Sequence, residues 1–154
     1  MDIDRAALKA EIILERKVMR LVNGRLAAVN LCDLCGCLNP TDLHECLISR
    51  GRARGNPELE QAILHSKYNV SLLCNPCNVR RAEVVVFRRF LISKNIDRYG
   101  LAPMTAWVKS LPFAAESQRE EYLNLLEDLA REMKPGRWAE VVEPALWNYG
   151  VRRR

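Results

Sequence analysis

The sequence has no long apolar run: none approaches the roughly 18 residues that a membrane-spanning helix needs. The opening residues Met1-Asp2-Ile3-Asp4 are acidic and lack the apolar segment of a secretory signal. Internal repeats and low-complexity segments are also absent from the sequence. These absences predict a cytoplasmic protein with no membrane partner, and they exclude repeat arrays.

What is present has the composition of an ordinary globular protein, with 49% hydrophobic and 28% charged residues. A chain of 154 residues is long enough for one modest domain with an extension, or for two very small ones. Six cysteines are a large number for a reducing compartment. Disulfides are rare there, so metal binding is the better explanation for them.

Basic residues gather in two segments of a chain whose formal net charge is +5. A Gly-rich loop at residues 49–55 and a predicted helix over residues 76–95 hold eight of the 24 basic residues, whereas the charges of residues 116–132 are mostly acidic. This distribution favours a polyanionic partner, while solvated surface arginines are the alternative. The candidate phosphate-contacting residues are Arg50, Arg52, Arg54, Arg80 and Arg81.

Apolar spacing predicts helices over residues 4–22, 57–66, 76–95, 103–111 and 117–133, and short strands over 26–31, 42–48 and 69–73. Asn56-Pro57 and Asn75-Pro76 each combine a capping residue with proline at the first helical position. The run from Val84 to Phe87 also suits a strand, but the wider apolar spacing favours a helix. Strand 42–48 is expected to be the return arm of a hairpin.

The expected fold is therefore α+β and has three parts. Residues 1–25 form an N-terminal helix, residues 26–97 form a small zinc-stabilised core, and residues 98–154 form a helical C-terminal extension. The two tryptophans of the tail, Trp138 and Trp147, are expected to pack within that extension.

Four of the cysteines form two Cys-x-x-Cys pairs, Cys32 with Cys35 and Cys74 with Cys77. A tight turn brings the two sulfurs of each pair to one ion, and four thiolates suit the tetrahedral coordination of Zn²⁺. The second pair opens a helix, whose N-terminal dipole favours thiolate. We therefore predict a structural zinc site. The alternative is four buried free thiols. Of the remaining two, Cys37 and Cys46, both are expected to pack as small apolar side chains, although Cys37 also competes as a ligand.

The order of Cys32-x-x-Cys35, Leu43-His44-Glu45 and the segment from Asn69 through Cys74 and Cys77 to Asn78 resembles the HNH endonucleases. The resemblance covers roughly residues 28–90. It implies a ββα-metal fold with a zinc clamp of two Cys-x-x-Cys knuckles. Asn69, Cys74 and Cys77 fall in step with the family pattern.

The resemblance also implies catalytic roles. Asn78 stands where the family has a metal-binding histidine, so the pattern becomes His-Asn-Asn. Apolar residues flank the family's metal-and-base pair on its strand, which assigns His44 to the metal and Glu45 to the general base. In the alternative register His44 is the base and Leu43 leaves the metal position empty. His44 and Asn78 would hold Mg²⁺ or Mn²⁺, and Asn69 would brace the loop by hydrogen bonds.

The leading functional hypothesis is an HNH-type endonuclease that hydrolyses DNA phosphodiester bonds with a divalent ion, in a bacterial or phage-infected cell. The rival is a non-catalytic module that grips nucleic acid or protein on the same zinc scaffold. A third possibility is an assembly protein that binds a partner through residues 101–154. The sequence leaves the oligomeric state open.

Overall fold

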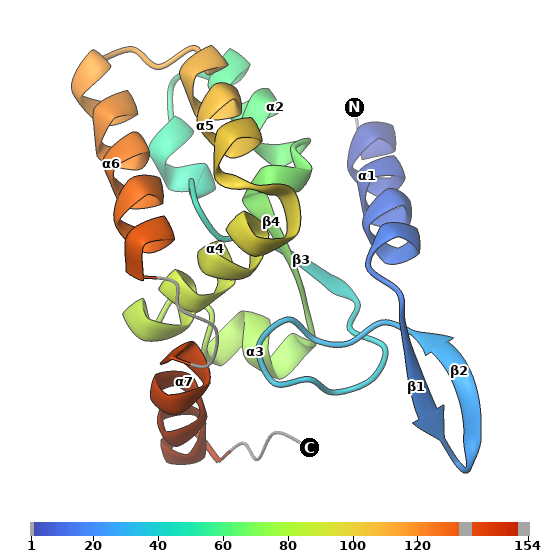
Figure 1. The fold of residues 1–154 in the computed structure, drawn as a ribbon. Coiled ribbons are helices and arrows are strands. Elements are labelled where there is room, and N and C mark those ends of the chain that lie inside the picture. The colour runs from blue at the N-terminus through green and yellow to red at the C-terminus, as the bar shows by residue number, and fades with distance from the viewer. Residues whose placement is uncertain (1, 133–136, 151–154) are drawn as a thin grey trace.

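The computed structural model describes residues 2–132 and 137–150, which form an α+β fold (Figure 1). Within these residues there are seven α-helices, two short 3-10 helices and two separate two-stranded antiparallel sheets. Their order is α1 (Asp2–Glu15), β1 (Val18–Val22), β2 (Arg25–Val29), β3 (Asp42–Glu45), η1 (Arg50–Ala53), α2 (Pro57–Leu64), η2 (Lys67–Asn69), β4 (Val70–Leu73), α3 (Asn75–Arg80), α4 (Val85–Tyr99), α5 (Leu101–Ser110), α6 (Glu116–Glu132) and α7 (Arg137–Asn148).

The first sheet is a hairpin that replaces the end of the helix predicted over residues 4–22. Helix α1 ends at Glu15, and β1 pairs antiparallel with β2 through a two-residue turn. Both turn residues have positive φ, 50° at Asn23 and 76° at Gly24. Asn-Gly suits a hairpin turn because both residues tolerate this conformation. The prediction was wrong here because it took Asn-Gly for the end of a helix.

The second sheet pairs β3 with β4, and this differs from the expected hairpin of residues 26–31 with 42–48. Asp42 lies opposite Leu73, and His44 lies opposite Ser71. Helix α3 follows β4 after a single residue, which completes a ββα unit whose two strands come from distant parts of the sequence. The intervening segment contains α2, where Asn56 caps the first turn by accepting a hydrogen bond from the backbone N–H of Leu59.

The helix expected over residues 76–95 is divided in two. Helix α3 ends at Arg80 because the backbone N–H groups of Arg81 and Ala82 both turn back to the carbonyl oxygen of Cys77. The buried Ala82 occupies the corner. Helix α4 then begins at Val85, so the run from Val84 to Phe87 is helical from its second residue, as the wider spacing predicted.

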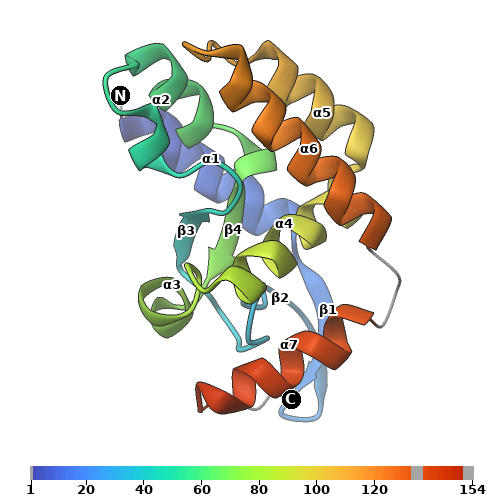
Figure 2. The ribbon, with the colours of Figure 1, turned by 90° about the vertical axis from the view of Figure 1, so that its left-hand side faces the viewer.

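Helix α4 lies at the centre of the hydrophobic core. Its Phe87, Leu91 and Ile92 are 0–1% exposed, and α5, α6 and α7 surround it in both views (Figures 1 and 2). One cluster of buried side chains runs from Cys32 to Leu146, so the C-terminal helices share the core of the cysteine-bearing region. Trp147 is half exposed, and the Trp138 side chain lies outside what the structure describes.

Within the described residues, the structure contains no helix that is both long enough and apolar enough to cross a membrane.

Candidate metal centre

Four cysteine sulfurs lie close enough together to hold a metal ion. The Sγ atoms of Cys32, Cys35, Cys37 and Cys74 are all within 4.8 Å of one another. Those of Cys35 and Cys74 are 3.7 Å apart. Ligands at about 2.3 Å from a tetrahedral zinc ion are about 3.8 Å from each other, so this pair already has the separation that such an ion imposes.

Two local structures place these sulfurs. In the first, the chain turns back on itself between Cys32 and Cys37. The N–H of Gly36 donates to the carbonyl oxygen of Cys32 at 2.9 Å, and the N–H of Cys32 donates to the carbonyl oxygen of Cys37 at 2.8 Å. Gly36 has a φ of 77°, which glycine adopts without steric cost. In the second, Cys74 caps α3, and its backbone N–H points at Sγ of Cys32 across 3.4 Å.

Cys77, the fourth predicted ligand, lies outside this group of four mutually close sulfurs, and Cys37 stands in its place. Hydrogen bonding with Cys32 and Cys35 raises the pKa of the Cys77 thiol, and Nη1 of Arg81 lies 3.3 Å from its sulfur. Cys77 is buried, whereas Cys37 is exposed. The exposed thiol of Cys37 therefore competes for the site instead of packing in the core. Cys46 is fully buried, as predicted, and burial raises the pKa of its thiol.

Mutual hydrogen bonding makes one of these thiols far more acidic than the others. Bonds from Cys32 and then Cys77 hold the pKa of Cys35 well below its usual range. The bond to Cys35 raises the pKa of Cys32 to about 11, while burial and the bond to Cys35 raise that of Cys37. One thiolate thus suppresses ionisation of its neighbours, because adjacent negative charges repel. A bound cation would allow several to ionise together.

Asp33 fastens the first cysteine turn to the rest of the protein. Its Oδ2 accepts hydrogen bonds from Nη1 of Arg16 at 3.1 Å and from the N–H of Leu72 at 2.9 Å. Its Oδ1 accepts one from Nη2 of Arg98 at 3.0 Å. These bonds connect the turn to α1, β4 and α4. Sequence reasoning missed them because the partners are far apart along the chain.

His44 and Asn78 meet beside this centre. The face of β3 that carries His44 is turned toward α3, and His44 is 9% exposed. Its Nδ1 lies 3.1 Å from Oδ1 of Asn78. Its Nε2 makes no hydrogen bond with any described residue, although Oε1 of Glu83 is 3.3 Å away. The two residues predicted to hold a divalent ion are thus brought together.

Asp42 fixes the orientation of the Asn78 amide. Its Oδ2 accepts a hydrogen bond from Nδ2 of Asn78 at 3.2 Å, which leaves the amide oxygen facing His44. Burial alone would raise the pKa of Asp42, but hydrogen bonds from Asn78, Thr41 and Asn75 outweigh it and lower that pKa. Asp42 and Glu83 are the two carboxylates near His44 that the sequence prediction missed. The signal for Asp42 was its position two residues before His44 on a strand.

The structure does not bring Glu45 together with His44 and Asn78. Successive side chains of a strand point to opposite faces, so Glu45 lies on the face turned toward α1, where its Oε1 accepts a hydrogen bond from Nη2 of Arg5 at 2.6 Å. The prediction placed the metal ligand and the general base at adjacent positions. In this structure, adjacent positions on β3 place the side chains of His44 and Glu45 on opposite faces of the sheet.

Asn69 is hydrogen-bonded to the loop after β3. The side chain is fully buried. Its Oδ1 accepts from the backbone N–H groups of Leu47 and Ile48 at 3.2 and 2.7 Å. Its Nδ2 donates to the carbonyl oxygens of Ile48 and Ile63 at 2.9 and 3.0 Å. Asn69 thus ties the segment after β3 to the end of α2.

The five arginines predicted to contact phosphates differ in their surroundings. Arg50 pairs with Glu60 at 3.3 Å and Arg52 with Glu121 at 3.1 Å, while Arg81 is bound to Cys77. Arg54 and Arg80 are exposed and form no ion pair among residues 2–132 and 137–150. Two of the five are therefore already partly neutralised by the protein itself.

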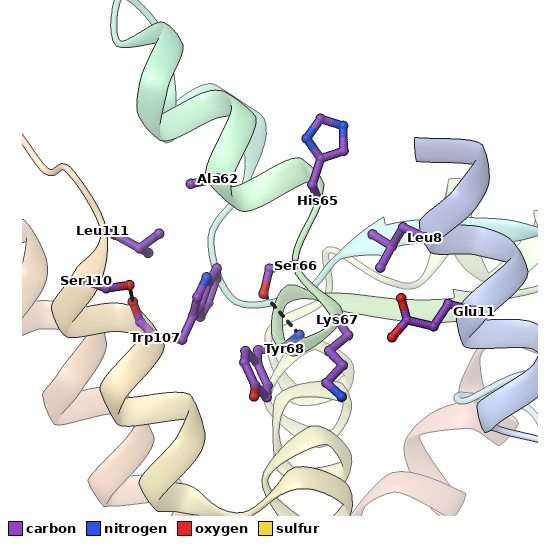
Figure 3. A pocket seen from close by; sticks show the side chains of 10 residues that line it. All are labelled: Leu8, Glu11, Ala62, His65, Ser66, Lys67, Tyr68, Trp107, Ser110 and Leu111. Atoms are coloured by element: carbon purple, nitrogen blue, oxygen red, sulfur yellow. Dashed lines mark hydrogen bonds between the residues drawn. The ribbon is translucent and has the colours of Figure 1, made fainter. Parts of the chain in front are cut away.

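A separate hollow of about 410 Å³ lies between α1, the end of α2 and α5 (Figure 3). The side chains of His65, Lys67 and Trp107 line it, and none of the cysteines does. His65, the second histidine of the chain, is therefore separate from the metal centre.

Comparison with protein-family models, with curated proteins and with solved structures found no match for this chain.

Proposed function

We propose that this protein is an HNH-type endonuclease that hydrolyses phosphodiester bonds in DNA with a divalent metal ion, on a scaffold held by structural zinc. The observation that carries the proposal is the meeting of His44 with Asn78, 34 residues apart in sequence and 3.1 Å apart at Nδ1 and Oδ1. The cysteine cluster lies near them, because its member Cys74 caps α3, the helix that carries Asn78.

The zinc ion is assigned to Cys32, Cys35, Cys74 and Cys77, with Cys37 as the competing ligand. Four sulfurs within 4.8 Å of one another, with Cys77 as their neighbour, match the preference of Zn²⁺ for thiolate. Zinc bound here would join the turn before β3 to the start of α3, and it would hold His44 and Asn78 in register. Its role is structural, since thiolates fill the coordination shell.

The divalent ion is assigned to His44 and Asn78. Two ligands at about 2.1 Å from an octahedral ion, on adjacent positions, are about 3.0 Å apart, which agrees with the 3.1 Å between Nδ1 and Oδ1. Bound Mg²⁺ or Mn²⁺ would stabilise the charge that develops on the leaving oxygen. Asp42 presents the amide oxygen, and Glu83 lies beside the free Nε2 of His44.

The base that activates water has two candidates. Glu45 is remote from the metal ligands and paired with Arg5, so it is replaced in this role. Glu83 is a solvent-exposed carboxylate whose Oε1 lies 3.3 Å from Nε2 of His44. His44 itself is the alternative, and it would then act as the base in place of binding the ion; its Nε2 has no hydrogen-bond partner among the described residues.

The second candidate function is a non-catalytic nucleic-acid-binding module. The pairing of Glu45 with Arg5 at 2.6 Å favours it, since that pairing leaves the expected base position without a base. The basic residues of the loop 49–55 and of α3 would serve either function, because contacts to phosphate supply affinity without reading sequence.

Incubation of purified protein with supercoiled plasmid, with and without Mg²⁺ or Mn²⁺, separates the two functions. We expect metal-dependent nicking that is lost in His44→Ala and Asn78→Ala but retained in His65→Ala, the matched control from the other histidine. Circular dichroism confirms that each variant is folded. DNA binding without cleavage under any metal would establish the binding module and refute the endonuclease.

A further inference from the structure

The β1–β2 hairpin extends away from the helical body of the protein (Figure 1). At its base, Nδ2 of Asn30 donates a hydrogen bond to the carbonyl oxygen of Ile13 at 2.8 Å, which ties β2 to α1. Beyond this tie, most of its residues are exposed, and the free end is the turn at Asn23 and Gly24. A two-stranded ribbon is marginally stable alone, so an exposed one calls for an explanation.

One face of the ribbon is entirely apolar. The register places Leu21 opposite Leu26 and Met19 opposite Ala28, with all four side chains on the same side. Each of them is exposed, Leu21 to 75% and Leu26 to 65%. The two leucines lie next to the turn, so the tip of the hairpin carries an apolar pair facing solvent.

The charges of the ribbon have one sign. The segment from Lys17 to Leu31 contains three basic residues and no acidic one. Lys17, Arg20 and Arg25 are exposed, and none of them forms an ion pair within the described part of the chain. They differ in this respect from Arg50 and Arg52 of the basic loop, which pair with glutamates.

We propose that the β1–β2 hairpin is a DNA-binding arm that enters a groove of duplex DNA. Arg20 and Arg25 would contact backbone phosphates, and the Leu21–Leu26 pair would press against the base steps. Two-stranded ribbons fit DNA grooves, and leucine and methionine side chains are used as wedges there. The inference rests on the proposed action on DNA, for which it names a second contact surface.

The place of the hairpin in the chain suits this role. Strand β2 ends at Val29, three residues before Cys32. Leu26, near the tip, is six residues from Cys32, a span of at most about 20 Å, so DNA held by the arm would lie within about 20 Å of the metal centre. The arm would thus add to the contacts expected from Arg54 and Arg80.

A second copy of the chain is a weaker explanation of the apolar face. A stable interface uses about 20–30 residues on each side, whereas this face offers four side chains. The unopposed positive charges of two arms would also repel each other. Charge and size together therefore favour a polyanion over self-association.

Fluorescence anisotropy with a labelled 30-base-pair duplex tests the arm, in buffer without Mg²⁺ or Mn²⁺ so that no cleavage occurs. We expect the double variant Arg20→Ala/Arg25→Ala to bind about tenfold or more weakly, and its plot of log affinity against log salt to lose about 1.8 in slope. Leu21→Ser/Leu26→Ser is expected to weaken binding without changing that slope. The control Lys109→Ala/Arg131→Ala removes the same charge from α5 and α6 and should bind as the parent protein does.

If the arginine variant keeps the DNA affinity and salt slope of the parent protein, the proposed DNA-binding role of the hairpin is wrong. It is also wrong if the parent protein does not bind the duplex. Sedimentation showing a dimer that the leucine variant abolishes would replace DNA with a second copy. Binding of the parent protein to anionic vesicles, lost in the leucine variant while duplex binding persists, would replace it with a membrane surface. If the hairpin variants weaken DNA binding but the parent protein does not nick plasmid, only the proposed hydrolysis is refuted. If the parent protein nicks plasmid but the hairpin variants bind DNA as it does, only the proposed role of the hairpin is refuted.

Discussion

Asn78 donates a hydrogen bond from its Nδ2 to Oδ2 of Asp42 across 3.2 Å, so that its Oδ1 faces Nδ1 of His44. The orientation of an amide is set by its partners, and a carboxylate accepts hydrogen bonds only. Asp42 therefore selects the rotamer that presents oxygen, the atom that a hard cation binds.

We predict that Asp42→Asn lowers Mn²⁺ affinity and the rate of plasmid nicking by about 10- to 100-fold, because an asparagine can donate as well as accept and no longer fixes the amide. Isothermal titration with Mn²⁺ and initial nicking rates measure the two effects. Thr41→Ala, which removes only a neighbouring bond to Asp42, serves as control. Equal Mn²⁺ affinities and nicking rates in Asp42→Asn and Thr41→Ala would show that Asp42 does not orient the Asn78 amide.

The cysteine cluster is predicted to bind one zinc ion per chain. Removal of that ion by a chelator should lower the midpoint of thermal unfolding and the helical circular dichroism signal. Among single variants, Cys77→Ser is expected to lose the metal, because Cys77 is buried and completes the second Cys-x-x-Cys pair. Cys37→Ser and Cys46→Ser should keep it. Elemental analysis and the absorption of the Co²⁺-substituted protein report the ligands. Loss of metal in Cys37→Ser and retention in Cys77→Ser would make Cys37 the fourth ligand.

Replacement of the fully buried Asn69 is predicted to cost about 3 kcal/mol or more. Asn69→Ala removes four hydrogen bonds and leaves the N–H groups of Leu47 and Ile48 buried without their side-chain acceptor. The midpoint of urea unfolding measures the loss. Asn124→Ala, on the exposed side of α6, should change the free energy of unfolding by less than about 0.5 kcal/mol. A similar small change for Asn69→Ala would contradict its bracing role.

The ion pair of Arg16 with Asp33 is buried, with side chains 3% and 6% exposed. We predict that Asp33→Ala destabilises the protein by about 3–5 kcal/mol, since it leaves the Arg16 charge without its partner, and that zinc affinity falls with it. Asp128→Ala, which breaks an exposed pair with Arg131, should cost less than about 1 kcal/mol. Comparable losses in the two variants would argue against a special role for Asp33.

Local signals in the sequence were sufficient for much of the fold. Asn56 and Pro57 start α2 as predicted, because a side-chain cap and a missing N–H are properties of the residues themselves. The pairing of Cys35 with Cys74 follows from the chemistry of thiols and needs no knowledge of the path between them. The α+β class followed from these elements.

Pairings between distant segments were beyond such reasoning. Residues 18–22 carry apolar side chains that suit a helix or a strand, and only pairing with β2 decides between them. The partner of β3 proved to be β4, which a reading of adjacent segments does not find. Glu45 shows the same difficulty at the site: the family register assigned it to the base, but the two-residue period of the strand directs it to Arg5 on the opposite face.

Cys35 and Cys74 are separated by 39 residues, so the two halves of the cluster leave the ribosome at different times. At about 5–20 residues per second, the first pair waits several seconds for the second. During that interval His44 has been made but Asn78 has not. Under the proposed function, the nuclease site would therefore stay incomplete until Asn78 and the second cysteine pair have been made.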